Sequence, residues 1–403
     1  MEIPDAGGNT MSDVSVIGGG PAGLMAAYRA LNRGLSVTLY DPNRQLGRKL
    51  RITGKGRCNV CNNCDIQTFL ANIPGDGRFL YPALNRFSPA DTMAFFEEIG
   101  VPLKTERGFR VFPVSDNAND VAEALVQKLR DGGCSFARKK VASLDELDSD
   151  AIILATGGCS YPVTGSDGNG YALAGSAGHT IIPPRASLIP LTSDDGYCAL
   201  LQGFAPKNVV LRLYEDDRLI YRELGEMLFT HFGVSGPLVL TASAHMRNVD
   251  QSDYRLEIDF KPALDEKKLD LRILRDFEEN SNKQFIHVLP GLTGRSMALV
   301  VAGLAGIEET KPCHEISHEE RVRLRTVLKA FPVHITGTRP IAEAIVTAGG
   351  VDTKEVNPRT MESKCRQGLH FAGEILNLDA YTGGFNLQIA WSTGFVAGES
   401  VLK

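Results

Sequence analysis

Short apolar runs, glycine turns and an alanine-rich segment alternate at the start of the chain. Residues 14–17 form an apolar run that stops at Gly18, which is typical of a buried strand. Residues 22–32 are rich in alanine and are followed by Gly34, so they predict a helix with a glycine stop. Residues 36–40 show a second strand pattern. The order of these elements predicts a β–α–β unit.

Further elements of the same kind follow along the first part of the chain. Ser88, with a proline after it, is a typical N-cap and predicts a helix over residues 88–99. Residues 117–130 predict another helix, closed by two glycines, and residues 151–154 predict a buried strand. Residues 42–65 are rich in glycine and cysteine, so we expect a long loop there.

The pattern changes at three prolines, Pro183, Pro184 and Pro190. Beyond them, short strand patterns alternate with turns up to residue 259, and residues 264–329 have a mostly helical pattern. After Thr336 the glycine-rich pattern of the first part returns. We therefore expect one domain formed by residues 11–185 and 336–403, with residues 186–335 inserted as a separate cap domain.

The length and composition fit a globular protein of two or three domains. The 403 residues are 43% hydrophobic and 23% charged, which is ordinary for a folded chain of this size. The longest apolar run, residues 298–307, is too short to span a bilayer, and no signal peptide is visible. Eight cysteines without a secretory signal are expected to be reduced thiols. These features predict a cytoplasmic protein with no membrane partner.

The charge of the chain limits the class of its partners. A net charge of −5 argues against stable, non-specific binding to nucleic acid. A local basic cluster lies in the predicted loop, however: Arg48, Lys49, Arg51, Lys55 and Arg57. It is interpreted either as a solvated loop that also neutralises a bound pyrophosphate, or as a patch for a transient encounter with nucleic acid.

The glycines at the first turn have the spacing of a dinucleotide-binding loop. Gly18-x-Gly20-x-x-Gly23 lies between the first predicted strand and the first predicted helix. In such a loop the glycines permit a tight turn, close approach of a pyrophosphate and close packing of helix on strand. Asp41 ends the second strand, at the position where a carboxylate accepts ribose hydroxyls. The alternative is a plain glycine turn with a surface aspartate.

Two further segments favour FAD over NAD. Residues 155–158, Ala-Thr-Gly-Gly, follow a predicted buried strand, and their small side chains let a chain pass close to a cofactor. Near the C-terminus, Glu374 follows a strand pattern and is placed to hold ribityl hydroxyls. The Gly383-Gly384 turn opens the last helix pattern, so its N–H groups can face the pyrimidine edge of a flavin.

Several motifs along the chain match one flavoprotein family in order. They are Gly47-Arg48-Lys49-Leu50, Gly54-Lys55-Gly56-Arg57-Cys58-Asn59, Arg110-Val111-Phe112-Pro113-Val114-Ser115, Thr230-His231-Phe232-Gly233-Val234-Ser235-Gly236-Pro237, Gly337-Thr338-Arg339-Pro340, Val346-Thr347-Ala348-Gly349-Gly350-Val351 and the segment from Phe371 to Gln388. In these motifs the chain resembles the BaiN/RdsA family of NAD(P)/FAD-dependent oxidoreductases, also called YhiN-like flavoproteins. The resemblance implies an α/β fold, with a glutathione-reductase-like FAD-binding Rossmann domain and an inserted β-barrel plus helical domain. It also implies non-covalent FAD, with NAD(P)H as a transient reductant.

The expected FAD-binding residues combine these motifs with positions that the resemblance adds. They are Gly18, Gly20, Pro21, Ala22, Gly23, Asp41, Arg48, Lys49, Arg57, Cys58, Val141, Ala155, Thr156, Gly157, Gly158, Gly373, Glu374, Asp379, Gly383, Gly384, Phe385, Asn386 and Leu387.

Two residues are candidates for a catalytic proton donor. Cys58 lies in a family motif beside Arg57, which is expected to lower the pKa of its thiol; a packing role is the alternative. His231 lies in another family motif within the inserted domain, and a structural histidine is the alternative there. Cys58-x-x-Cys61-x-x-Cys64 lacks the nearby fourth cysteine of an iron–sulfur run, so we expect no metal site.

The resemblance implies an enzyme that saturates a polarised C=C bond. Family members are associated with reduction of uridine to dihydrouridine in large-subunit ribosomal RNA, or with reduction of a steroid double bond in bile-acid metabolism. We favour the ribosomal RNA substrate, with the RNA or its precursor as a transient partner. A small-molecule enone is the alternative substrate. A non-enzymatic flavin and thiol redox sensor that uses the Cys58 to Cys64 run is the second alternative.

Overall fold

The computed structural model describes residues 12–249 and 251–403. Residue 11, where the predicted first domain segment begins, lies outside the described residues. The chain divides into two compact units: the described residues up to Ser187 together with Pro340–Lys403, and Leu188–Arg339. The second unit therefore begins two residues and ends four residues later than the expected insertion. Each unit is described by itself.

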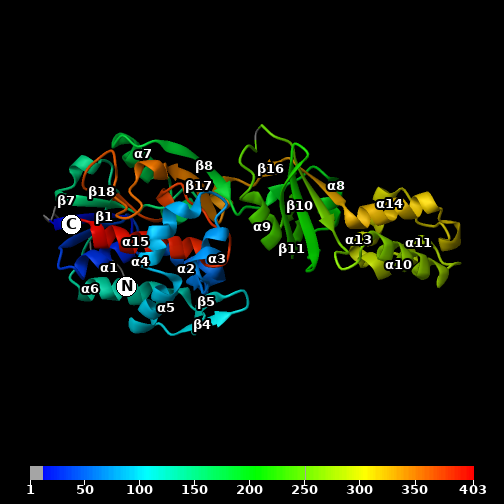
Figure 1. Ribbon diagram of the computed structural model, residues 1–403, viewed down its shortest axis with the longest axis horizontal. Coiled ribbons are helices and arrows are strands. Elements are labelled where there is room, and N and C mark those ends of the chain that lie inside the picture. Colours follow the sequence, from blue (N-terminus) through cyan, green and yellow to red (C-terminus); the bar gives the residue numbers. More distant parts are fainter. Residues whose placement is uncertain (1–11, 250) are drawn as a thin grey trace. The chain divides into compact units, whose positions relative to one another are not determined.

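A five-stranded parallel sheet forms the centre of the first unit (Figure 1). Its strand order is β18-β7-β1-β2-β6, and its strands are β1 (Ser12–Ile17), β2 (Val37–Tyr40), β6 (Ser135–Ala137), β7 (Ser149–Leu154) and β18 (Leu369–Phe371). All neighbouring pairs run parallel. Strands β1 and β2, with helix α1 (Pro21–Leu31) between them, confirm the predicted β–α–β unit. The carboxyl ends of β1, β2 and β7 meet at one edge of the sheet, where ligands bind in open α/β sheets.

The C-terminal helix α15 (Phe385–Ser400) packs closely against α1. A Cβ atom added at Gly394 would lie 2.4 Å from the carbonyl oxygen of Ala22, and one added at Gly398 would lie 2.3 Å from that of Ala26. Glycine at these positions is what lets the two helix backbones approach each other. The C-terminal segment is thereby fixed beside the glycine turn that precedes α1.

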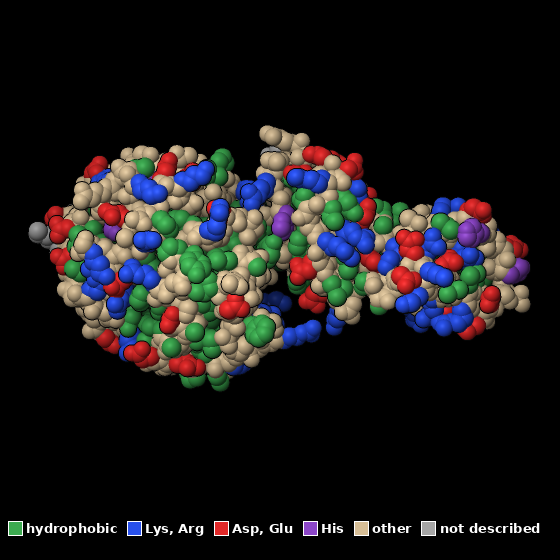
Figure 2. Space-filling view, viewed as in Figure 1, with side chains coloured by type: hydrophobic (Ala, Val, Ile, Leu, Met, Phe, Trp, Pro, Cys, Tyr) green, Lys and Arg blue, Asp and Glu red, His purple; other side chains and the backbone are tan. Residues whose placement is uncertain are grey.

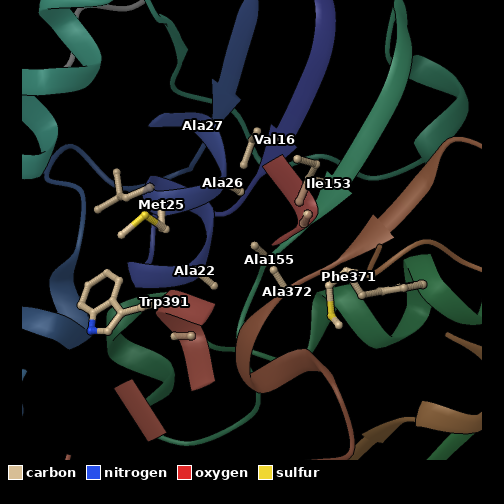
Figure 3. Close-up of a cluster of buried hydrophobic side chains, with 14 of the residues drawn as sticks. Val16, Ala22, Met25, Ala26, Ala27, Ile153, Ala155, Phe371, Ala372 and Trp391 are labelled. Carbon is tan, nitrogen blue, oxygen red and sulfur yellow. The ribbon is translucent and has the colours of Figure 1, made fainter. Parts of the chain in front are cut away.

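The hydrophobic core of the first unit joins its two chain segments (Figure 3). Val16 of β1, Ile153 of β7 and Phe371 of β18 are buried in it together with the small residues of α1. Trp391 of α15 is fully buried, and its indole Nε1 donates a 3.0 Å hydrogen bond to the carbonyl oxygen of Val60. Residues from both ends of the chain therefore contribute to one continuous core.

Smaller elements complete the first unit. Helix α5 (Pro89–Glu98) carries a capping box between Ser88 and Asp91, and α6 (Ala118–Asp131) is capped by Asn117, so both expected helices are confirmed. The other elements are α2 (Arg48–Gly56), β3 (Cys61–Asn62), α3 (Ile66–Ala71), η1 (Gly77–Leu80), α4 (Tyr81–Arg86), β4 (Leu103–Glu106), β5 (Arg110–Pro113), η2 (Leu144–Glu146), η3 (Pro162–Thr164), α7 (Asn169–Ser176), β8 (Ile181–Ser187), η5 (Ile341–Glu343), β17 (Val346–Val351), η6 (Thr353–Glu355) and η7 (Gly373–Ile375). Strands β3, β5 and β4 form an antiparallel sheet, and β8 pairs with β17.

Residues 42–65 are not the continuous loop that we expected, because they contain the kinked helix α2 and the short strand β3. Within α2 only Leu50 is buried, so no apolar stripe in the sequence could predict the helix. Contacts to distant residues hold it in place instead. Arg51 donates to the carbonyl oxygen of Leu46 and forms a 2.8 Å ion pair with Glu123 of α6.

The second unit contains a strand-rich part followed by a helical part. Its strands are β9 (Leu191–Thr192), β10 (Val209–Glu215), β11 (Arg218–Gly225), β12 (Leu228–Thr230), β13 (Gly233–Ser235), β14 (Tyr254–Asp259), β15 (Phe331–Ile335) and β16 (Gly337–Thr338). Hydrogen bonding divides the strands of the expected barrel into two four-stranded sheets, with the orders β11-β10-β14-β15 and β12-β13-β9-β16. The helices are α8 (Gly196–Leu200), α9 (Pro237–Ser243), α10 (Glu266–Glu278), α11 (Phe285–Val288), α12 (Pro290–Thr293), α13 (Arg295–Ala305), η4 (Cys313–Glu315) and α14 (His318–Lys329).

The second unit has a hydrophobic core of its own, to which the sheet residues Leu211, Leu256 and Phe331 belong. Among the described residues, no single helix has both the length and the apolar composition of a membrane span. The segments Phe285–Thr293 and Arg295–Ala305 meet these criteria only as a pair, with a bend of 115° between them. Many of the apolar side chains of this pair lie in the core of the unit.

Candidate functional site

A cavity of ≈220 Å³ lies in the first unit at the carboxyl edge of the parallel sheet. Residues that directly follow β1, β2 and β7 line it, and residues 139–141 contribute from beyond β6. The first turns of α15 and residues 345–346 complete the lining. This is the position at which open α/β sheets bind nucleotides.

The glycine turn after β1 leaves space on its cavity side. Gly18 has a left-handed φ of 105°, and a Cβ atom there would lie 2.4 Å from the carbonyl oxygen of Ala155. At Gly23 an added Cβ would lie only 1.9 Å from the oxygen of Gly18, so this glycine permits the close packing of helix on strand. An added Cβ at Gly20, by contrast, meets no atom within 4 Å. Gly20 therefore borders open space beside the N-terminus of α1, where a pyrophosphate binds in this type of fold.

Asp41 presents a buried carboxylate to the cavity. The residue is 8% exposed, and its Oδ2 accepts a 2.7 Å hydrogen bond from the backbone N–H of Gly19. Its Oδ1 accepts from the backbone N–H of Asn43 at 2.8 Å. Burial raises the pKa of this carboxyl above its ordinary value, and the hydrogen bonds from Asn43 and Gly19 act in the opposite direction. Each carboxylate oxygen can accept more than one hydrogen bond, so Asp41 can also hold ribose hydroxyls.

On the cavity wall, Glu374 of η7 lies at the centre of a polar network. Its carboxylate forms a 2.7 Å ion pair with Lys49 of α2 and accepts hydrogen bonds from the Ser160 hydroxyl at 3.0 Å and from the Thr347 backbone N–H at 2.8 Å. Lys49 Nζ also donates to Ser160 Oγ at 2.5 Å. Both charged side chains are 19% exposed. The network fixes two predicted cofactor residues, Lys49 and Glu374, at the same wall of the cavity.

The residues present fit a bound dinucleotide such as FAD. The open space at Gly20 suits a pyrophosphate, and the acceptor Asp41 suits a ribose. Many of the predicted cofactor residues line the cavity: Gly18, Gly20, Pro21, Ala22, Asp41, Arg48, Lys49, Val141, Ala155, Thr156, Gly157, Glu374, Asn386 and Leu387.

The structure does not bring the other predicted cofactor residues into this lining: Gly23, Arg57, Cys58, Gly158, Gly373, Asp379, Gly383, Gly384 and Phe385. Several of them have packing roles. A Cβ at Gly384 would lie 2.4 Å from the Cys61 backbone, and Phe385 is buried with its ring 5.2 Å from that of Phe69. The carboxylate of Asp379 accepts a 2.6 Å hydrogen bond from Ser187. Direct contact of these residues with a cofactor stays a prediction, except for Cys58, which is enclosed in the core.

Cys58 is enclosed in the hydrophobic core, with 0% of its surface exposed. Burial raises the pKa of its thiol to about 12. The guanidinium of Arg57 is turned toward Glu106 and Asp116, and it pairs with Asp116 at 2.6 Å. The expectation that Arg57 lowers the pKa of Cys58 is therefore wrong. A thiol that is enclosed in the core cannot reach a cofactor or a substrate, so we correct its expected cofactor and catalytic roles to a packing role.

The basic cluster carries less free charge than the sequence suggested. Lys49, Arg51 and Arg57 have acidic partners, which are Glu374, Glu123 and Asp116 respectively. Lys55 is exposed and has no ion pair with the described residues. The cluster is thus largely used to hold the fold together around the cavity.

His231 lies in the second unit, in the tight turn between β12 and β13. Its side chain is exposed, and its ring lies 5.1 Å from that of Phe232 at an angle of 81°. Arg339 stacks over Phe232 on the same turn, 4.9 Å from the ring centroid. The role of His231 as proton donor stays a prediction.

One group of metal-ligand type occurs among the described residues, and it differs from the cysteine run considered in the sequence. His179, Glu355 and Cys365 have ligand atoms within 4.8 Å of one another. His179 already has protein partners: its Nδ1 lies 3.3 Å from Glu355 and its Nε2 lies 2.6 Å from Ser363 Oγ. These contacts give the group a structural role in linking α7 and β8 to η6.

Several residues of the cavity were not predicted from the sequence. They include Asn43, Lys139, Lys140, Thr164, Gly165, Ser166 and Asp167. Lys140 forms a 2.5 Å ion pair with Asp167. The sequence feature that could have predicted its place at the cavity is its position shortly after β6, the strand next to β2. Because β6 is a parallel neighbour of β2, the residues that follow the two strands, Lys140 and Asp41 among them, meet at the same edge of the sheet.

Comparison with known proteins identifies the family of the chain and supports its fold. The family model described as the HI0933-like protein Rossmann domain matches residues 12–400. A 3-dehydro-bile acid delta(4,6)-reductase of Clostridium scindens is 29% identical, with 98% of this chain and 100% of the relative aligned. The ribosomal RNA dihydrouridine synthase of Escherichia coli is 28% identical, with 97% and 98% aligned. Among solved structures, a 3-ketosteroid-delta4-(5alpha)-dehydrogenase of Rhodococcus jostii has a similar fold, with a TM-score of 0.51, 14% identity and 100% of both chains covered.

The fold and the cavity define a Rossmann-type FAD-binding protein. The chain belongs to the HI0933-like family, which contains the BaiN and YhiN/RdsA flavoproteins that the sequence motifs resemble. It is accordingly an FAD-dependent oxidoreductase.

Proposed function

We propose that the protein uses FAD and NAD(P)H to saturate the polarised C=C bond of uridine in large-subunit ribosomal RNA, which gives dihydrouridine. The proposal rests on one observation above others. A cavity suited to FAD lies in a chain that aligns over nearly its whole length with two reductases of different substrates, an RNA uridine and a steroid. Both relatives, by their names, add hydrogen to a C=C bond, so the reaction type is common to them.

The division of roles follows from the chemistry of such a reduction. FAD, when bound, supplies hydride transfer to one carbon of the double bond. The chain must hold the cofactor, orient the substrate and deliver a proton to the second carbon. The glycine turn and Asp41 are placed to hold the cofactor. No second Gly-x-Gly-x-x-Gly motif is present in the sequence, so we infer that NAD(P)H binds transiently without a domain of its own.

His231 is the proposed proton donor, because its exposed imidazole lies on a turn of the inserted unit. The test compares His231→Gln with the wild-type holoprotein in two separate half-reactions. Reduction of the bound cofactor by NAD(P)H should be unchanged, and its reoxidation by substrate should slow by about 100-fold or more, the usual effect of a lost general acid. Normal reoxidation in the variant would remove His231 from the mechanism.

The substrate is tested by supplying both classes to the same holoprotein. Large-subunit ribosomal RNA that lacks dihydrouridine and a steroid enone are incubated separately with NADH or NADPH, and the products are analysed by mass spectrometry. We expect a gain of two hydrogens in a uridine of the RNA. An enzyme that acts on ribosomal RNA would work in the cytoplasm, where that RNA is found. Reduction of the enone alone would favour the second candidate, which the C. scindens relative supports with its 29% identity over the full chain.

The thiols give little support to the redox-sensor alternative. Cys58 and Cys61 are buried, and burial raises the pKa of both thiols. Burial also raises the pKa of Cys64 to about 11. Redox-sensing cysteines need an accessible thiolate, which these residues do not offer at neutral pH.

A further inference from the structure

The hairpin between β4 and β5 presents a large aromatic side chain at its tip. The turn consists of Arg107, Gly108 and Phe109. At its base, Glu106 of β4 lies opposite Arg110 of β5 in the backbone pairing of the two strands. The Phe109 side chain is 63% exposed, and its backbone has a left-handed φ of 58°. Glycine or asparagine is usual at such a position, because a bulky side chain there is strained. Because the Phe109 ring is exposed, burial in the core does not offset the strain of this backbone conformation. A strained residue without such a packing benefit points to a role in binding.

The tip of this hairpin is positively charged, although the whole chain has a net charge of −5. Arg107 and Arg110 are exposed, and neither forms an ion pair with the residues that the structure describes. Arg110 Nε donates a 3.0 Å hydrogen bond to the carbonyl oxygen of Arg107, which keeps the two residues together. The neighbouring acids Glu106 and Asp116 are neutralised by Arg57 and Lys104.

Hydrogen bonds connect the tip of the hairpin to residues 62–63 and, through Asn62, to Gly383. The backbone N–H of Asn63 donates to the carbonyl oxygen of Phe109 at 2.7 Å. The Asn62 side chain donates at 3.1 Å to the carbonyl oxygen of Gly108 and at 3.0 Å to that of Gly383. Gly383 lies two residues before the start of α15, whose residue Asn386 lines the cavity. The strained turn is therefore hydrogen-bonded through Asn62 to the segment that leads into α15.

We propose that the β4–β5 hairpin is a docking element for single-stranded RNA, with Phe109 stacking on a base and Arg107 and Arg110 contacting the flanking phosphates. The proposal rests on the proposed function and extends it by naming the element that binds the substrate. An aromatic side chain can stack only on a base that is unpaired. Two arginines beside it match the charge of the adjoining backbone. A bile acid, the substrate class named for the other relative, has one carboxylate and no base, so it does not match an aromatic ring flanked by two arginines.

Binding of a labelled 12-nucleotide oligouridylate to the holoprotein tests the hairpin without turnover. Phe109→Ala should weaken binding by about 5- to 150-fold, the usual effect of losing one base stack, and Phe109→Tyr should restore it. Arg107→Ala combined with Arg110→Ala should make the negative slope of log K against log salt shallower by about 1.4, since each phosphate contact on a single strand contributes about −0.7 to it. Phe109→Gly relieves the strained backbone, so it should fold at least as stably as the wild type and still bind weakly.

Matched controls lie in the second unit. Leu200 is an apolar side chain with 78% exposure, and Arg222 is an exposed arginine without an ion pair to the described residues. Leu200→Ala and Arg222→Ala should bind the oligonucleotide as the wild type does, and all variants should contain the same amount of FAD.

The proposal is overturned if the hairpin variants bind like the wild type, or if a duplex of the same length binds equally well. It is also overturned if the wild-type protein reduces an enone but binds no oligouridylate, an outcome that leaves the C=C reductase in place. Loss of binding in the hairpin variants supports the docking role even if no RNA is reduced, and in that case the proposed reaction alone fails.

Discussion

Lys49 and Glu374 lie 325 positions apart in the chain and form a 2.7 Å ion pair on the wall of the nucleotide cavity. The pair connects α2, which follows the second strand of the Rossmann unit, with η7, which follows the last strand. Ser160 bridges the two charged groups through its hydroxyl. The two segments of the first unit are therefore joined at the cavity by charge as well as by the hydrophobic core.

Lys49→Met should destabilise the first unit and reduce its FAD content. The substitution keeps the length of the side chain but leaves the largely buried Glu374 carboxylate without its cation. We expect a loss of about 1–3 kcal/mol in the free energy of unfolding, the usual effect of leaving a buried polar group unpaired. Denaturant titration of the apo-protein measures this loss. Arg78→Met is the control, because the pair of Arg78 with Asp76 is exposed and its loss should not be measurable; equal effects of the two substitutions would contradict the role of Lys49.

Cys58→Ala should affect stability and leave the chemistry intact. The thiol is fully buried in the core, so its removal leaves a small cavity and should lower the free energy of unfolding by about 1 kcal/mol. FAD content and the rate of substrate reduction should stay within about twofold of the wild type, since no general acid is lost. Stopped-flow reoxidation of the reduced holoprotein checks this result. A decrease of about 100-fold with full FAD content would show that Cys58 does donate the proton.

His334 should make the stability of the second unit depend on pH. Its ring nitrogens lie 3.0 Å from Asp194 and 3.3 Å from Asp253, and these carboxylates raise its pKa above the ordinary value. The stabilisation is therefore fully present below about pH 6.5, the unfolded-state pKa, and is lost as the pH rises through the folded-state pKa.

Thermal melts of wild type and His334→Gln between about pH 5.5 and 8.5 measure this effect. The difference in Tm should be largest at the acidic end and should shrink as the pH rises. His287→Gln is a suitable control, because His287 is exposed and has no ion pair with the described part of the chain. A difference for His334→Gln that grows with pH would contradict the assignment.

The parts of the site that depend on local order could be predicted from the sequence. The first predicted strand, the glycine spacing after it and the acid at the end of the next strand occupy 28 consecutive positions from residue 14 to 41. Strands β1 and β2 and helix α1 bring them to one edge of the sheet by short connections. Gly20 and Asp41 consequently line the cavity as expected. The same holds for Ser88 and Asn117, whose capping depends only on residues within three positions.

The parts that depend on distant contacts could not be predicted. The neighbour of Arg57 in the sequence is Cys58, but in the structure its guanidinium meets Glu106 and Asp116 of the β4–β5 region. Sequence proximity therefore gave the wrong sign for the pKa shift of Cys58, which burial dominates. The close approach of the Cys61 backbone to Gly384 could not be predicted from the sequence either, and contact of Gly384 with a flavin stays a prediction.

The FAD content of two glycine variants tests most directly whether the cavity binds FAD. A side chain at Gly20 would enter open space, whereas one at Gly23 would collide with the Gly18 carbonyl at 1.9 Å. Gly20→Val should therefore fold like the apo-protein and yet carry no FAD, because its side chain occupies the place of the pyrophosphate. Gly23→Val should fail to fold stably. The measurement is the flavin released per chain on denaturation, together with the Tm against FAD-stripped wild type. We expect about one FAD per wild-type chain and none in folded Gly20→Val. Full FAD occupancy in Gly20→Val, or a wild-type protein that binds no FAD, would show that this cavity is not the FAD site.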